Sequence, residues 1–127
     1  MKRSFSLVLC SLFFATFLFA RDAREEQRIN FLIDSLNDLP GAVFIRNGNE
    51  YKAAAAREHL LAKLKYAGEK IQTAEQFVKA CASESSMSHQ PYRIRFKDGH
   101  EVETASYFYE KLREFDAGLP AKHPPAL

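Results

Sequence analysis

Apolar side chains return every three or four residues in four separate stretches of the chain, which is the period of an amphipathic α-helix. Thr73 and Gln76 have the spacing of a capping box, and Asp22 and Thr104 also stand where a side-chain oxygen can cap a first turn. The inward-facing positions that we expect are Ile29, Leu32, Ile33 and Leu36 in the first helix, Ala56, Leu60, Leu64 and Ala67 in the second, Ala74, Phe77, Val78 and Cys81 in the third, and Ala105, Phe108, Leu112 and Phe115 in the fourth.

Two further stretches alternate apolar and polar side chains and run into a glycine turn, which is the pattern of a β-hairpin. The first covers residues 43–51 and turns at Asn47-Gly48, and the second covers residues 92–103 and turns at Asp98-Gly99. The segment 83–90 holds four serines and predicts a loop. The fold class that follows is α+β, with about four helices packed on one face of a small antiparallel sheet made of two short hairpins.

The first twenty residues differ in character from the remainder of the chain. Two basic residues, Lys2 and Arg3, precede an apolar run over residues 5–19, which Ala20 closes, and this is the order of a secretory signal peptide. The run is shorter than the roughly twenty apolar residues that a membrane-spanning helix needs. We therefore predict a signal peptide over residues 1–20 and no stable membrane anchor after its cleavage.

Cleavage changes the charge of the protein. The chain carries 18 basic and 16 acidic side chains, and the predicted signal peptide contains two of the basic ones and no acidic one. The mature protein is therefore formally neutral, which removes the electrostatic argument for a nucleic-acid partner. We expect a single α+β domain over residues 21–118 and a disordered tail over residues 119–127, where three prolines interrupt any periodic pattern.

Cys81 is the one cysteine that remains after the predicted cleavage, so it cannot form an intramolecular disulfide. Its place on the apolar face of a helix predicts a buried, inert thiol. The strong catalytic and metal-binding motifs are absent from the sequence: there is no paired-cysteine zinc spacing, no His-Glu-x-x-His, no glycine-rich phosphate loop and no Gly-x-Ser-x-Gly elbow. The four histidines are scattered. We therefore predict no metal site and no cofactor.

A few polar side chains remain as candidates for chemistry. His59 and Lys63 are four residues apart on the second predicted helix, and their shared face is either plainly solvated or one side of a polar site. Ser85 or Ser86 could act as a nucleophile with His59 as its base, as in a small hydrolase. No elbow and no assignable acid partner accompany that pair.

The predicted hairpins place basic side chains beside tyrosines. Arginine next to tyrosine is typical of recognition surfaces, and it would suit an anionic ligand group or a protein partner. The alternative interpretation is the ordinary solvent face of a half-covered sheet. The residues concerned are Arg46, Arg93, Arg95 and Lys97, with Tyr51 and Tyr92 as neighbours.

Several short segments between residues 24 and 96 form a recognisable series in order and spacing. They are Arg28-Ile29-Asn30, Phe44-Ile45-Arg46-Asn47-Gly48, His59-Leu60, Thr73-Ala74-Glu75-Gln76-Phe77, Ala82-Ser83, Ser85-Ser86 and Pro91-Tyr92. Together they resemble the YfeK-like family of small exported bacterial proteins, a domain of unknown function. The resemblance implies a periplasmic location in a Gram-negative cell and brings no activity with it.

We expect one polar surface at positions where packing alone does not demand a polar side chain. Its members are Arg46, Asn47, His59, Lys63, Ser85, Ser86 and Tyr92. Thr73 and Glu75 are left out, because a helix cap and a first-turn carboxylate explain them. The expected function is a non-catalytic periplasmic binding or protein-interaction module, whose partner is another envelope protein or a small anionic ligand. The alternative is a small envelope hydrolase that uses His59 with Ser85 or Ser86.

Overall fold

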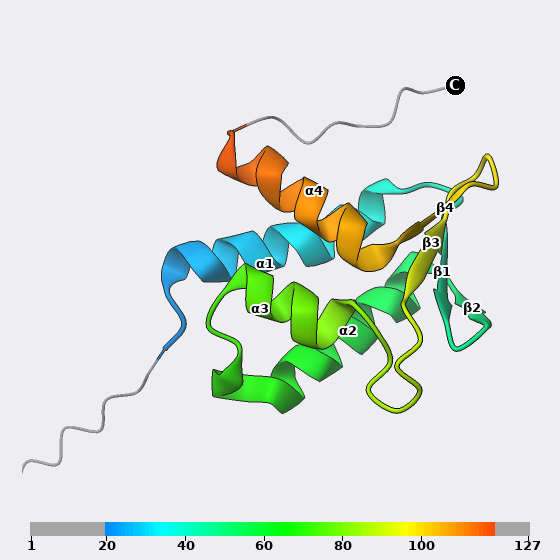
Figure 1. Ribbon diagram of the computed structural model, residues 1–127. Helices are drawn as coiled ribbons and strands as arrows, with labels where there is room; N and C mark the ends of the chain where they lie inside the picture. The colour runs from blue at the N-terminus through cyan, green and yellow to red at the C-terminus, as the bar shows by residue number, and fades with distance from the viewer. Residues whose placement is uncertain (1–19, 119–127) are drawn as a thin grey trace, which may run out of the picture.

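Helices and strands follow one another along residues 20–118, the part of the chain that the computed structural model describes (Figure 1). The α-helices are α1 (Ala23–Ser35), α2 (Ala53–Ala67), α3 (Ala74–Phe77) and α4 (Thr104–Asp116). The strands are β1 (Val43–Arg46), β2 (Asn49–Tyr51), β3 (Arg93–Arg95) and β4 (Glu101–Glu103). Short helical turns extend three of the helices, over Leu36–Asp38, Gly68–Lys70 and Val78–Ala82, and the last of these is π-helical.

The two hairpins join into one antiparallel sheet with the strand order β2-β1-β3-β4. Phe44 of β1 lies opposite Ile94 of β3, and both side chains are buried in the middle of the sheet. The helices lie on one side of this sheet (Figure 1). The predicted α+β fold class is therefore confirmed, and each hairpin leads directly into a helix, α2 or α4.

The first hairpin turns through two residues with left-handed backbone. Asn47 has φ 51° and Gly48 has φ 75°, which is the conformation that a tight two-residue hairpin turn requires at both central positions. Asparagine and glycine adopt it at little cost, because a short polar side chain or none relieves the clash with the backbone. The turn brings Tyr51 opposite Phe44 and so returns a tyrosine to the helix side of the sheet.

Helix α3 begins as its sequence predicts. The Thr73 hydroxyl accepts a hydrogen bond from the Gln76 amide at 3.1 Å, and the Gln76 side chain accepts one from the Thr73 amide at 3.3 Å. This capping box satisfies two amides that have no partner inside the helix. Asp22 caps α1 in the same sense, because its carboxylate accepts from the Arg24 amide at 2.7 Å.

The expectation that Thr104 caps the last helix is wrong. Helix α4 begins at Thr104 itself, and Glu103 occupies the cap position without a side-chain cap bond. The Thr104 side chain is buried, and its amide donates to the Tyr92 carbonyl at 2.9 Å. A backbone contact across the sheet therefore fixes this helix start, and no sequence-local signal reports it.

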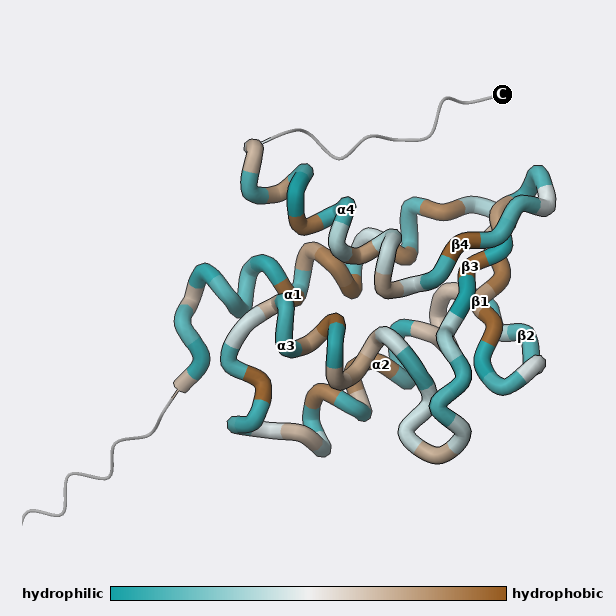
Figure 2. Tube along the Cα trace, in the orientation of Figure 1, coloured by the Kyte–Doolittle hydropathy of each residue, from teal (hydrophilic) through white to brown (hydrophobic). Residues whose placement is uncertain are grey.

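The core lies between the helices and the inner face of the sheet, where Figure 2 shows hydrophobic positions on α1, α3 and the central strands. Cys81 is 1% exposed, which confirms its predicted burial, and burial raises the pKa of its thiol. Tyr107 was not expected in the core, yet its ring is buried and its hydroxyl lies 3.1 Å from the Ser35 hydroxyl. Burial raises the pKa of Tyr107 to about 12.

A cluster of charges around Arg28 ties three helices together. The Arg28 guanidinium contacts the carboxylates of Glu75 at 2.5 Å, Glu25 at 3.0 Å and Asp116 at 3.0 Å, although only 7% of Arg28 is exposed. Glu25 also accepts from the Ala74 amide at 2.7 Å. Hydrogen bonds from Arg28 lower the pKa of Glu75. The interpretation of Glu75 as a first-turn carboxylate was incomplete, because its main partner is an arginine from another helix.

The ends of the described segment lie close together. Arg24 at the start of α1 contacts Asp116 at the end of α4 at 3.4 Å. The predicted signal peptide, apart from Ala20, and the predicted tail over residues 119–127 lie outside the described residues. Within residues 20–118, none of the helices combines the length and the apolar character that a membrane crossing requires.

Candidate binding site

Side chains from α2, the first hairpin and the segment before β3 meet at one end of the sheet. Arg46 is the last residue of β1 and Tyr51 is the last residue of β2. His59 and Lys63 lie one turn apart on α2, so they share a face of that helix. Tyr92 stands directly before β3, and its ring is buried against this face. Residues distant in sequence are therefore brought together by the packing of one helix on one sheet edge.

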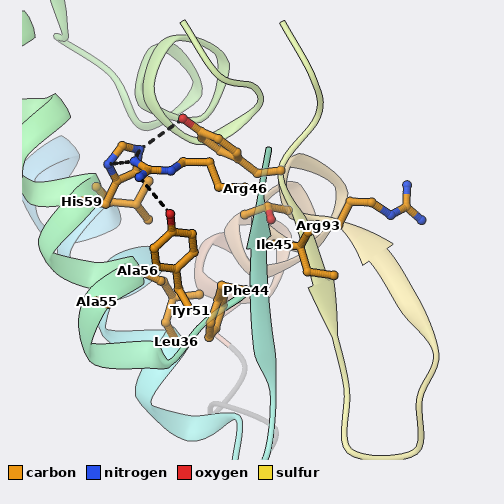
Figure 3. Close-up of a pocket in the computed structure, with 12 residues that line it drawn as sticks. Leu36, Phe44, Ile45, Arg46, Tyr51, Ala55, Ala56, His59 and Arg93 are labelled. Atoms are coloured by element: carbon orange, nitrogen blue, oxygen red, sulfur yellow. Dashed lines mark hydrogen bonds between the residues drawn. The ribbon is translucent and has the colours of Figure 1, made fainter. Parts of the chain in front are cut away.

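Hydrogen bonds connect these five side chains, and Figure 3 draws those that join Arg46 to His59 and to Tyr51. Arg46 donates from Nη1 to His59 Nδ1 at 2.7 Å and from Nη2 to the Tyr51 hydroxyl at 3.2 Å. His59 Nε2 lies 3.1 Å from the Tyr92 hydroxyl, to which Lys63 Nζ also donates at 3.3 Å. The Arg46 guanidinium lies 5.0 Å from the Tyr51 ring centre, and Lys63 Nζ lies 5.1 Å from that of Tyr92. Both distances allow cation–π attraction.

The contacts of His59 indicate a neutral imidazole. Arg46 can only donate, and its Nη1 lies 2.7 Å from Nδ1 and 3.2 Å from Nε2, so at least one ring nitrogen must present a lone pair. Partial burial lowers the pKa of His59, and the positive charges of Arg46 and Lys63 lower it further. An anion placed beside the ring would oppose both effects and would favour the imidazolium form, which donates from both nitrogens.

No carboxylate neutralises the two cations of this network. Within residues 20–118, neither Arg46 nor Lys63 forms an ion pair. Acidic side chains of the adjoining segments are paired elsewhere, since Glu84 contacts a histidine of its own loop and Glu50 contacts an arginine of β3. The site therefore gathers positive charge and holds no built-in counter-ion.

A cavity of about 150 Å³ opens beside the cations, between α2 and the first hairpin (Figure 3). Arg46, His59 and Tyr51 lie along it with their polar atoms. The other residues that line it, most of which are apolar, are Leu36, Phe44, Ile45, Ala55, Ala56, Leu60, Tyr92, Arg93 and Thr104. Ala55 and Ala56 present single methyl groups toward the sheet, so the space between helix and strand stays open where a larger side chain would fill it.

Of the other predicted site residues, Asn47 and Ser85 lie beside this network, and Ser86 lies apart from it. Asn47 Nδ2 donates to Ser85 Oγ at 3.4 Å, and the Ser88 hydroxyl donates to the Asn47 side-chain carbonyl. Ser85 is buried, and its oxygen also accepts from the amides of Met87 and Ser88 at 3.4 Å. Ser86 is exposed and makes no side-chain hydrogen bond within the described segment. The serine-rich loop is thus fastened to the hairpin turn through Ser85.

The predicted arginine–tyrosine surface is wrong in one respect, because its members lie on opposite faces of the sheet. Arg93 and Arg95 point to the face away from the helices, where both pair with Glu101 and Arg95 also pairs with Glu50. Arg93 also lines the cavity, but Figure 3 shows its side chain directed away from it. Arg46 alone among the strand arginines brings its guanidinium to the site.

The register of the sheet explains this division. Side chains alternate between the faces of a strand, so Arg46 shares the helix side with the buried Phe44. Ile45 points outward and lies opposite Arg93. Lys97 lies beyond the end of β3 and is exposed. The sequence showed the alternation within each hairpin, but the pairing of β1 with β3 decided which basic residues share a face.

Sequence reasoning also missed part of the site. Tyr51 was noted as a neighbour of arginine and was not included in the polar surface, although its hydroxyl accepts from Arg46. Ala56 was expected only as an inward-facing position of the second helix, and Ala55 was not singled out, although both line the cavity. A signal for it existed in the run of four alanines over residues 53–56, which is unusual for a helix face that packs on a sheet.

The site contains no metal-binding arrangement. Across residues 20–118, no group of three or more histidine, cysteine, aspartate or glutamate side chains is placed to hold a metal ion. The polar groups of the site are the cations of Arg46 and Lys63, the imidazole of His59 and the phenols of Tyr51 and Tyr92. These groups can bind and orient an anion.

Comparison with known proteins agrees with the motif series described above. The model of a family described as "Family of unknown function (DUF5329)" matches residues 23–116, which include every residue of the network. The chain belongs to this family. It is also 39% identical over 71 residues to the "Uncharacterized protein YfeK" of Salmonella typhimurium strain LT2. The predicted resemblance to YfeK-like proteins is thereby confirmed.

The extent of that second match is limited. It covers 56% of this chain and 59% of the Salmonella protein, so the aligned part spans less than two thirds of that relative. No solved structure gives a significant match to the chain. The geometry of the network and its cavity therefore carries the functional argument.

Proposed function

We propose that this chain is an exported periplasmic binding module, without catalytic activity of its own, that captures an anionic group of a small ligand or a protein partner. The observation that carries the proposal is the concentration of Arg46 and Lys63 around His59, with no carboxylate paired to either cation among residues 20–118. Gathering like charges costs free energy unless a counter-charge is bound. Export is supported by the order of charge, apolar run and alanine in residues 1–20.

The hydrolase alternative gains no support from the geometry. His59 makes its side-chain hydrogen bonds to Arg46 and Tyr92, and none of them goes to Ser85 or Ser86. The Ser85 hydroxyl accepts from backbone amides and from Asn47, which organises its own loop. A nucleophile needs its base within hydrogen-bond reach, and here arginine takes that position.

The test begins with the protein recovered from the periplasmic fraction of a Gram-negative host, where export predicts a new N-terminus after Ala20. Acetate and inorganic phosphate are titrated into it, and amide chemical shifts are followed by NMR. We expect saturable shifts at His59 and Tyr92, and binding weaker by roughly tenfold in Arg46→Met, because one charge-assisted hydrogen bond contributes about 1.5 kcal/mol.

Lys97→Met is the matched control, since Lys97 is an exposed cation that does not line the cavity. It should bind both anions like the native protein. Equal weakening in the two variants would mean that net charge alone attracts the anions. Absence of any saturable shift near His59 would remove the proposed function.

A further inference from the structure

The network and the cavity together have an amphipathic character. The cations and hydroxyls gather along one side, at Arg46, His59 and Tyr51, whereas the remaining wall is mostly carbon from residues such as Phe44 and Leu60. A ligand that only carried charge, such as phosphate, would leave the apolar part of the cavity unfilled. Apolar surface next to a few fixed polar groups is the usual composition of a small-molecule site.

The dimensions of the cavity restrict the apolar part of a ligand. Its volume is about 150 Å³, and an apolar cavity of about that volume admits a benzene ring. The methyl groups of Ala55 and Ala56 bound it on the helix side, and the Phe44 ring bounds it on the strand side. One ring or one branched aliphatic group is therefore the largest body that fits without movement of α2.

The polar groups indicate the kind of anion. Arg46 presents a planar guanidinium whose two Nη atoms already donate to His59 and Tyr51, which is the fork geometry that matches two carboxylate oxygens. A carboxylate that took the place of the His59 nitrogen would accept from Arg46, and the ring could then donate to the same anion after protonation. A single carboxylate can therefore use both Arg46 and His59.

We propose that the ligand of this site is a carboxylate attached to one compact apolar group, an aromatic ring or a branched aliphatic chain. The inference rests on the proposed function and narrows it from any anionic group to this class. Two sources share the chemistry: a free small organic acid, and the C-terminal residue of a peptide that ends in an apolar side chain. The apolar group occupies the cavity between Ala56 and Phe44, and the carboxylate pairs with Arg46.

The experiment compares five probes on the exported native protein by calorimetry: 3-phenylpropanoate, its uncharged amide, acetate, the tripeptide Gly-Gly-Phe and its C-terminal amide. We expect 3-phenylpropanoate to bind at least roughly tenfold more tightly than acetate, because ring burial adds to the anion contact, and more tightly than the amide by a similar factor. Gly-Gly-Phe is compared with its C-terminally amidated form. Tighter binding of the free-acid peptide than of 3-phenylpropanoate assigns the peptide terminus as the source, and weaker binding assigns the small acid.

Variants that fill the cavity provide the structural control. Ala56→Leu should remove the advantage of 3-phenylpropanoate over acetate while acetate still binds, and Ala55→Leu offers the same test at a more exposed position should Ala56→Leu unfold the domain. Ala54→Leu is the matched control, because Ala54 is exposed and does not line the cavity. It should keep the native preference.

The outcomes separate this inference from the proposed function. If 3-phenylpropanoate binds no more tightly than acetate while acetate binding depends on Arg46, the ligand class is wrong and the anion-binding function stands. An unchanged preference in both filled variants would likewise overturn the placement of the apolar group. If none of the anions binds, both proposals are wrong.

Discussion

Two arginines of this domain are held in opposite electrostatic surroundings. Arg28 lies between α1, α3 and α4 and contacts three carboxylates, from Glu25, Glu75 and Asp116. Arg46 lies between the first hairpin and α2, and its partners are a neutral imidazole and a phenol. Both side chains are taken partly out of water, but among residues 20–118 only the first is paired with opposite charge.

The difference assigns different roles to the two clusters. A compensated cation, fixed by several hydrogen bonds, joins elements and contributes to folding, and its removal leaves like charges unpaired. An uncompensated cation in an open cavity contributes little to folding, because its counter-charge is missing. Its favourable interaction is made when an anion arrives. The comparison thus separates a structural cluster from a binding cluster in the same small domain.

The largest expected effect is on the structural cluster. Arg28→Met should lower the free energy of unfolding by roughly 2–3 kcal/mol, below the value for breaking a fully buried pair because Glu75 and Asp116 are about half exposed. Methionine keeps most of the packing of the arginine stem. Urea unfolding followed by circular dichroism measures the change.

Arg46→Met is the matching control for that measurement. It should shift the free energy of unfolding by less than about 0.5 kcal/mol in either direction, because no internal ion pair is lost. A loss as large as that of Arg28→Met would mean that both clusters are structural, and it would break the comparison on which the binding role depends.

The second prediction concerns the pH dependence of stability, in which His59 of the binding cluster and Glu75 of the structural cluster act over different pH ranges. The pKa of His59 is lowered from its ordinary 6.5, so the folded state binds fewer protons than the unfolded state, and stability is complete above about pH 6.5 and falls as the pH drops below it. The pKa of Glu75 is lowered from 4.5, so its contribution is present above pH 4.5 and is lost as the pH falls through the folded pKa. Unfolding curves measured from pH 8 to pH 3 report both windows.

Single variants assign each window to its residue. His59→Gln should flatten the dependence below about pH 6.5 and leave the acid window of Glu75 in place. Glu75→Gln should remove the loss of stability below about pH 4.5 and leave the dependence on His59 in place. It should also lower the free energy of unfolding at neutral pH. A His59→Gln protein that keeps the native slope above pH 5 would show that another group titrates there.

The smallest expected effect comes from supplying the missing carboxylate. Ala55→Glu places an acidic side chain one helical turn before His59, on the face that lines the cavity. It should raise the free energy of unfolding by about 0.3 kcal/mol and weaken acetate binding, because the new carboxylate competes with the anion. Unfolding and calorimetry on the same protein test both effects together. Ala54→Glu adds the same charge outside the cavity, and it should change both the free energy of unfolding and the affinity for acetate by less.

Much of the fold could be predicted because its signals are local. The capping box at Thr73 and the Asn47-Gly48 turn depend on residues within four positions of each other, and both occur as expected. The expectation that Thr104 caps α4 was wrong for the opposite reason, since α4 begins at Thr104 and the Thr104 amide donates to the carbonyl of Tyr92, directly before β3. The grouping of Arg46, His59, Lys63 and Tyr92 was expected from their polar character, but no local pattern showed that Arg93 would face away.

The amino-acid sequence by itself determined the periods of the helices and strands, the turns, the buried position of Cys81 and the family to which the chain belongs. These follow from spacing along the chain, where the geometry of the backbone sets which side chains share a face. The tertiary structure decided which charges are paired. Arg28 contacts three carboxylates, whereas Arg46 contacts none among residues 20–118. Whether a charge is paired depends on distances across the packed interfaces of the helices and the sheet, which the spacing along the chain does not show.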